Sequence, residues 1–182
     1  FKSGGTKMYM CGYSSDSVHQ YSLSTPWLVS SATYDSVSFN HKTACTEDSV
    51  RDLVFKPDGT KLYITGSGTD SVYEFDLSSA WDLSTTTYSS VNLSVSSQDV
   101  SPNGLALSAD GLRVFIIGST APDAVHQYDL STAWDLSTAT YNNVQFVVST
   151  QEAVPLSMLF NPDGTKMYVC GTTDKVFEYD LS

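Results

Sequence analysis

The sequence has few basic residues. It contains 9 Lys and Arg against 20 Asp and Glu, which gives a formal net charge of -11 at pH 7. A surface of this sign repels phosphate backbones and anionic lipids, so nucleic acid and membrane surfaces are poor candidate partners. No apolar run approaches the length of a transmembrane helix, so membrane insertion is not expected either.

Cysteine is also scarce, and common catalytic motifs are missing. The 3 cysteines form no C-x-x-C arrangement. Cys11 and Cys170 occupy one position of a repeat that holds Thr65 and Ile117 in its other copies, which indicates a packing position rather than a metal site. There is no G-x-S-x-G motif and no phosphate loop, and no base is placed beside the many serines. We therefore predict no catalytic residue.

The sequence does contain an internal repeat. The phrase "KPDGTKLYITG" (56–66) returns as "NPDGTKMYVCG" (161–171), with related copies at 2–12 and 108–118. A second phrase, "YDLSTAWDLSTATY" (128–141), has earlier copies at 75–88 and 21–34. The copies follow one another at intervals of 52 to 54 residues. The repeat is least regular at "NHKTACTED" (40–48), where an individual function would be sought first.

Each repeat reads as four short strands. Pro-Asp-Gly turn chemistry precedes a β-branched and aromatic run, and an alternating strand such as "VFEYDL" follows to complete a hairpin. Repeats of this length and strand content are typical of β-propeller blades. We predict an all-β fold with about 3.5 four-stranded antiparallel blades in one propeller segment, residues 1–182. The repeat units are approximately 1–53, 54–105, 106–158 and a partial unit at 159–182.

Half a blade is left over, and that raises the question of ring closure. Propellers typically close with four to eight blades. Two explanations remain open. Either the chain is part of a longer tandem-repeat protein, or several copies complete a ring together. The expected partners therefore include further blades or other copies of the chain.

The repeat phrase also carries a family resemblance. The WD40 and kelch types are excluded by the period, by the lack of a Gly-His opening and by the lack of a recurring Gly-Gly doublet. The pattern F-x-P-D-G-T-K-x-Y-x-x-G followed by V-x-x-Y-D-L-S resembles the YVTN/NHL-like propeller repeats. It is most similar to the tandem repeats of bacterial surface proteins and of phage or viral structural proteins. The resemblance covers essentially the whole chain and implies a propeller outside the cell, on a cell surface or on a virion.

One set of acidic residues recurs before the strand expected to line the central channel: Glu47, Asp99 and Glu152. Carboxylates that ring a channel mouth could bind Ca²⁺ through their oxygen atoms. The alternative is that each carboxylate accepts hydrogen bonds from backbone N–H groups of its own loop. We expect no other cofactor.

Two sets of aromatic residues also recur, namely Trp27, Trp81 and Trp134 and then Tyr34, Tyr88 and Tyr141. An aromatic platform on each blade could stack against sugar rings. The alternative is that each tryptophan packs its connecting segment against its own sheet.

The functional prediction follows from this regularity, because nearly every polar residue obeys the repeat. We expect a non-enzymatic structural or recognition module that binds proteins or glycans through repeated loops, in an extracellular, cell-surface or virion setting. One alternative is a lactonase- or hydrolase-like propeller enzyme whose catalytic residues lie largely outside this segment. A second alternative is a secreted lectin that uses the repeated tryptophans.

Overall fold

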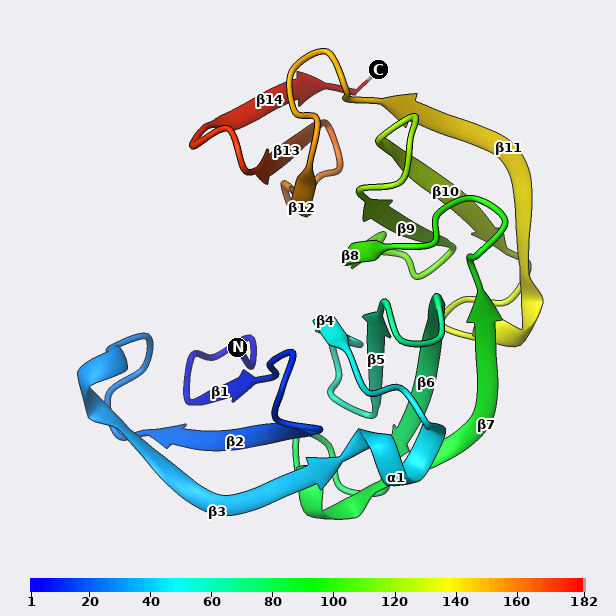
Figure 1. Cartoon of the computed structure of the whole chain (residues 1–182). Coiled ribbons are helices and arrows are strands. Elements are labelled where there is room, and N and C mark those ends of the chain that lie inside the picture. The colour runs from blue at the N-terminus through cyan, green and yellow to red at the C-terminus, as the bar shows by residue number, and fades with distance from the viewer. Residues whose placement is uncertain (182) are drawn as a thin grey trace.

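The structure is a computed structural model that describes residues 1–181. Its four antiparallel sheets follow one another around an open arc (Figure 1). We call them blades 1 to 4. Blade 1 comprises β1 (Lys7–Met10), β2 (Ser17–Leu23) and β3 (Ala32–Asn40). Blade 2 comprises β4 (Val50–Phe55), β5 (Lys61–Gly66), β6 (Ser71–Leu77) and β7 (Thr86–Ser94).

The other two blades repeat this arrangement. Blade 3 comprises β8 (Pro102–Leu107), β9 (Arg113–Gly118), β10 (Ala124–Leu130) and β11 (Ala139–Val147). Blade 4 comprises β12 (Pro155–Phe160), β13 (Lys166–Gly171) and β14 (Val176–Asp180). Strand order follows chain order, from β4, β8 and β12 on the inside of the arc to β3, β7 and β11 on the outside (Figure 1). These strands confirm the prediction of an all-β, partial propeller.

The connections within a blade arise from local sequence chemistry. In the turn before β5, Asp58 Oδ1 accepts hydrogen bonds from the backbone N–H and the hydroxyl of Thr60, at 2.9 and 2.6 Å. The next position, Gly59, has φ +77°, a conformation that favours glycine. Between the last two strands of blades 1, 2 and 3 lies a connector, defined here as residues 24–31, 78–85 and 131–138. Each connector contains one turn of 3₁₀-helix: η1 (Val29–Ser31), η2 (Leu83–Thr85) and η3 (Leu136–Thr138).

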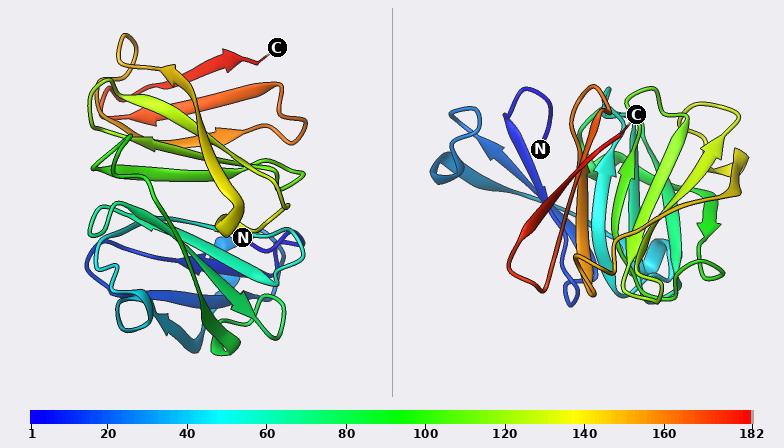
Figure 2. Two further views of the ribbon diagram at one scale, coloured as in Figure 1. Left: turned by 90° about the vertical axis from the view of Figure 1, so that its right-hand side faces the viewer. Right: turned by 90° about the horizontal axis from the view of Figure 1, so that it is seen from above.

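The hydrophobic core lies between blades rather than inside them. Figure 2 shows the sheets stacked face against face. One buried cluster joins blades 1 and 2, a second joins blades 2 and 3, and a third joins blades 3 and 4. Blade 2 has neighbours on both sides, and its Leu62, Tyr63 and Ile64 are fully buried. Each blade therefore depends on its neighbours to bury apolar surface.

One short helix was not predicted. Helix α1 (His41–Cys45) forms in the irregular stretch between β3 and β4. The Asn40 side chain accepts a hydrogen bond from the backbone N–H of Thr43 at its start, and its end residue Thr46 has φ +66°. The helix is too short to leave a periodic pattern in the sequence. Within residues 1–181 we find no helix with the length and apolarity needed to span a membrane.

Candidate functional site

The recurring tryptophans fasten each connector to the turn of their own blade. The backbone N–H of Trp81 donates to the carbonyl of Gly59 at 2.9 Å, and Trp134 makes the same bond with Gly111 at 2.9 Å. The indole covers this glycine so closely that a Cβ built on Gly59 would lie 2.2 Å from Trp81 Nε1. Trp27 has the same relation to Gly5 in blade 1.

Each connector also binds the blade before it. The Tyr9 hydroxyl of blade 1 donates to the carbonyl of Trp81 in blade 2, at 2.6 Å. Two residues further along the connector, the N–H of Leu83 donates to Gln20 Oε1 of blade 1 at 2.9 Å. Trp81 consequently lies between two blades and is 8% exposed, whereas Trp27 is 59% exposed.

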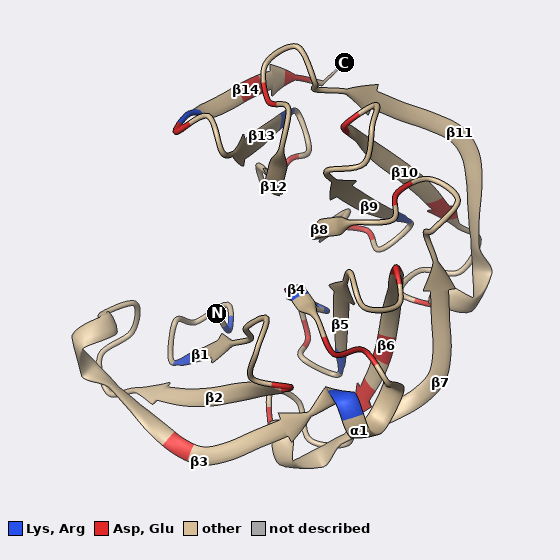
Figure 3. Ribbon diagram, viewed as in Figure 1, with Lys and Arg blue, Asp and Glu red and all other residues tan. Residues whose placement is uncertain are grey.

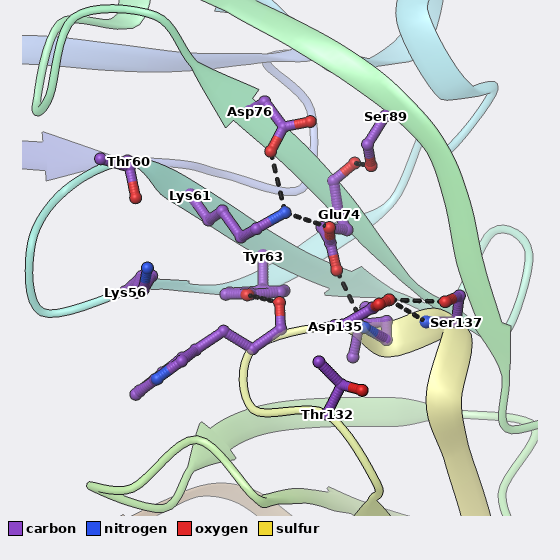
Figure 4. Close-up of polar contacts among 12 residues, drawn as sticks. Lys56, Thr60, Lys61, Tyr63, Glu74, Asp76, Ser89, Thr132, Asp135 and Ser137 are labelled. Atoms are coloured by element: carbon purple, nitrogen blue, oxygen red, sulfur yellow. Dashed lines mark hydrogen bonds and ion pairs between the residues drawn. The ribbon is translucent and has the colours of Figure 1, made fainter.

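The same contacts join blades 2 and 3 (Figure 4). There the Tyr63 hydroxyl donates to the Trp134 carbonyl at 2.7 Å, and the Leu136 N–H donates to Glu74 Oε2 at 2.9 Å. Glu74 is buried, and its other oxygen is paired with Lys61. These contacts give the tryptophans a packing role, and whether they also bind sugars stays a prediction.

The recurring tyrosines lie on the outermost strands, apart from the tryptophans. Their rings pack against the neighbouring strand, with centroid separations of 5.3 Å for Tyr21–Tyr34 and 5.2 Å for Tyr128–Tyr141. Tyr88 packs in the same way against Phe75, at 5.5 Å. No aromatic pair within residues 1–181 joins a connector tryptophan to one of these tyrosines. The structure does not bring the two sets together as one platform.

The recurring acidic residues are buried, each within its own blade. Glu47 Oε1 accepts hydrogen bonds from the N–H groups of Ser49 and Gly68, at 2.8 and 3.0 Å, and Oε2 accepts from Thr69. Glu152 repeats this pattern with Val154, Thr172 and Thr173, and Asp99 accepts from Ser101 and Thr120. The part of the chain that the structure describes holds no group of three or more His, Cys, Asp or Glu arranged to bind a metal ion. The carboxylates therefore hold the loops, and the structure does not bring Glu47, Asp99 and Glu152 together as a ring.

A different polar pair lies on the innermost strand of blade 2. Arg51 and Asp52 occupy positions that hold Asn103 and Gly104 on β8. The Arg51 guanidinium is exposed, with its carbon 4.5 Å from the centroid of the Tyr13 ring of blade 1. Arg51 Nε also donates to Ser67 Oγ at 3.4 Å. Figure 3 shows acidic positions on all four blades and a basic position on β4, at the inside of the arc.

Asp52 lies between the innermost strands of two blades. Its Oδ2 accepts from the N–H of Leu105 on β8 at 3.0 Å, and its Oδ1 accepts from the N–H of Leu53 at 2.8 Å. Burial raises the pKa of this carboxyl above its ordinary value, against the opposing effect of these two hydrogen bonds. Asp52 faces blade 3, whereas the neighbouring Arg51 faces Tyr13 of blade 1, so the two side chains lie on opposite faces of β4.

Sequence reasoning missed this pair because it looked for features that recur. The signal was present in the alignment of the repeat copies, where only the β4 copy has a charged pair. On β8 the position of Arg51 is held by Asn103. The Asn103 side chain joins two blades, because its Nδ2 donates to the Pro155 carbonyl of blade 4 at 3.0 Å.

No protein-family model matches the sequence, and no curated protein matches it. Solved structures do match. A candidate 6-phosphogluconolactonase from Bacteroides uniformis matches all of this chain with a TM-score of 0.68 at 13% identity. The periplasmic gluconolactonase of Pseudomonas aeruginosa matches all of it with a TM-score of 0.65 at 15% identity. The Cps50 (Swd1) β-propeller domain of Myceliophteria thermophila matches with a TM-score of 0.60 at 10% identity.

The chain spans about half the length of these structures, at 49%, 48% and 52% of their chains. At such identities the likeness shows the shared fold, which is a propeller. The comparisons give no support to the narrower assignment to YVTN/NHL-like repeats, which stays a prediction.

One prediction is contradicted by this comparison. We expected a protein without enzymatic activity, yet the structures that match the chain over its whole length include lactonases. The expectation rested on the regularity of the repeat, which is a property of the scaffold. The same fold can carry recognition or catalysis, so regularity of the scaffold is no argument against an active site.

Proposed function

We propose that this chain is part of a lactonase-like propeller hydrolase, which opens a cyclic ester of a sugar acid. The observation that carries the proposal is the match of all of this chain to about half of a candidate 6-phosphogluconolactonase and of a gluconolactonase. Two neighbouring residues of β4 at the inside of the arc support it, because Arg51 supplies a cation and Asp52 supplies a carboxyl, the two kinds of group that such a reaction uses. The extracellular or surface setting and the binding of glycans remain further proposals.

In this proposal Arg51 binds the anionic substituent of the substrate. A guanidinium offers several N–H donors in a fixed plane that match a phosphate or carboxylate. The Tyr13 ring and Ser67 hydroxyl hold the guanidinium in place. Because the chain as a whole is strongly negative, an exposed cation at the inside of the arc would select where an anion binds.

Asp52 is the proposed general base. A water molecule adds to the lactone carbonyl carbon as Asp52 takes one of its protons, the ring C–O bond breaks, and the proton passes to the departing ring oxygen. The products are a hydroxyl group and a carboxylic acid, so all atoms are accounted for. The raised pKa of Asp52 suits this task, because a base works best when its pKa approaches the working pH.

The test is a pH-stat measurement of acid release from 6-phosphogluconolactone and from gluconolactone, against hydrolysis in buffer alone. We expect Asp52→Asn to lower kcat by at least about 100-fold. We expect Arg51→Gln to raise KM by about 10-fold or more for the phosphorylated lactone, and less for the unphosphorylated one. Arg113→Gln is the matched control, because Arg113 lies at the opposite end of its blade and pairs with Asp129. Acid release at the buffer rate with both lactones would overturn the proposal.

A further inference from the structure

A large groove separates blades 3 and 4. Its volume is about 1020 Å³, and its lining includes Phe115 and Gln127 of blade 3 and Phe160, Gly164 and Leu181 of blade 4. The corresponding places between blades 1 and 2 and between blades 2 and 3 are filled by the connectors that contain Trp81 and Trp134.

The residues on the blade 3 side correspond to those that bind a connector elsewhere. Phe115 pairs with Gln127 across β9 and β10, as Tyr9 pairs with Gln20 in blade 1. Phe115 also packs on Phe160 with a centroid separation of 4.4 Å, and Tyr9 packs on Phe55 at the same 4.4 Å. The groove thus repeats the geometry of an established interface, with an aromatic ring and a side-chain acceptor in the expected places.

The outermost strand of blade 3 carries the matching apolar surface. In blades 1 and 2 the outermost strands β3 and β7 contact the 3₁₀ turns η2 and η3 of the following connector. There the apolar residues Val37 and Phe39 are partly buried against the core. Their counterparts on β11, Val144 and Phe146, are 44% and 45% exposed. This surface fits the leucine-containing turn of a connector.

The blade 4 side supplies the turn glycine that a connector tryptophan covers. Gly59 and Gly111 each lie against an indole, whereas a Cβ on Gly164 would meet nothing within 4 Å among the described residues. Gly164 has the same left-handed conformation, with φ +72°. Leu181 holds the position from which connectors depart, because its N–H bonds to Thr165 as the N–H of Leu130 bonds to Leu112.

We propose that this groove is a docking site for a connector of the Ala-Trp-Asp-Leu-Ser type, joined directly to Leu181 and lying between Phe115 and Gly164. The tryptophan ring covers Gly164 and packs on Phe115 and Phe160. The following leucine lies on Val144 and Phe146, with its N–H donating to Gln127.

The test adds a copy of residues 132–138 after Ser182 of the full chain, because Ser182 corresponds in sequence to Ser131. We expect the melting temperature to rise by at least about 5 °C and the emission of the added tryptophan to shift to shorter wavelength, because its ring leaves water. The control is the same extension with its tryptophan and leucine replaced by alanine, which should leave the melting temperature of the parent chain unchanged.

A second variant tests the groove itself. Phe115→Tyr restores the hydroxyl that Tyr9 and Tyr63 donate to a connector carbonyl, so it should enlarge the rise in melting temperature by a further 2 °C or so in the extended chain alone. Equal melting temperatures for the tryptophan-containing and alanine-containing extensions would overturn the proposal. So would added tryptophan emission at the wavelength of a solvent-exposed indole.

Discussion

Replacing Gly59 with alanine tests how the connector tryptophan holds a blade together. Gly59 has φ +77°, and the new Cβ would lie 2.2 Å from Trp81 Nε1. Two costs therefore add. The left-handed conformation costs an ordinary residue about 1–2 kcal/mol, and forcing extra volume into a packed site costs about 1–3 kcal/mol. Trp81 has little room to move, because Tyr9 and Phe55 lie on its other side. The expected loss in free energy of unfolding is about 2–5 kcal/mol.

The chain provides its own controls for this change. Gly164 has φ +72° but no atom within 4 Å of the Cβ position among the described residues, so Gly164→Ala should lose only the conformational cost of about 1–2 kcal/mol. The loss in free energy of unfolding for Gly5→Ala should be close to this lower value, because Trp27 is 59% exposed and its ring can move away from the new Cβ. Urea unfolding followed by circular dichroism measures all three variants. Equal losses for Gly59→Ala and Gly164→Ala would refute the reasoning that the indole contact matters.

Three further predictions concern charge and burial. Lys61→Met leaves the buried Glu74 without its cation and should lower the free energy of unfolding in urea by about 3–5 kcal/mol. Lys166→Met should lower it by less than about 1 kcal/mol, because the partners of Lys166 are 50% and 87% exposed. Equal losses in the two variants would contradict this prediction. For Glu152, burial acts to raise the pKa, but hydrogen bonds from its loop outweigh burial and lower the pKa below 4.5. Its charged form therefore stabilises the fold above pH 4.5. The difference in free energy of unfolding between wild type and Glu152→Gln should shrink as the pH falls below that value. Urea unfolding at several pH values measures this difference, and a constant difference would disprove the prediction. Burial raises the pKa of the Cys45 thiol to about 11. At pH 8 a thiol reagent should therefore label Cys45 far more slowly in the folded chain than in urea. Peptide mass spectrometry measures the two labelling rates, and equal rates would contradict the prediction.

Local chemistry explains why so much of the fold was predictable. The Pro-Asp-Gly turns, the alternating strands and the period of 52 to 54 residues are properties of short segments, and each appears in the structure where the sequence places it. The half blade expected after three whole blades is not formed, because the structure has a three-stranded sheet at each end of the arc and two four-stranded sheets between them. Helix α1 escaped prediction because five residues are fixed by their caps and by burial of His41 and Cys45 rather than by periodicity.

Contacts between blades could not be read from the sequence in the same way. Gln20 and Glu74 look like ordinary polar positions of an alternating strand, yet each accepts a hydrogen bond from the next blade. The left-handed backbone of Trp81, with φ +66°, is likewise a tertiary feature, since the bond to Gly59 and the neighbouring blade together hold it. The Gln20 and Glu74 contacts join residues 63 and 62 positions apart, and only the stacking of the blades reveals them.

The candidate site shows a different kind of limit. Arg51 and Asp52 are visible as departures from the repeat, but their proximity to Tyr13 and Leu105 depends on how three blades meet. The residues that recur build the scaffold of a repeat protein, whereas an active site on that scaffold is built from residues that do not recur.

The most direct test of the functional claim is a titration of the chain with 6-phosphogluconate, the product of the proposed reaction, followed by ¹H–¹⁵N NMR. If the inside of the arc binds the anion, the largest shifts will fall on Tyr13, Arg51 and Ser67. Those shifts will be lost in Arg51→Gln and kept in Arg113→Gln. Shifts that are absent, or that survive the loss of Arg51, would contradict the account.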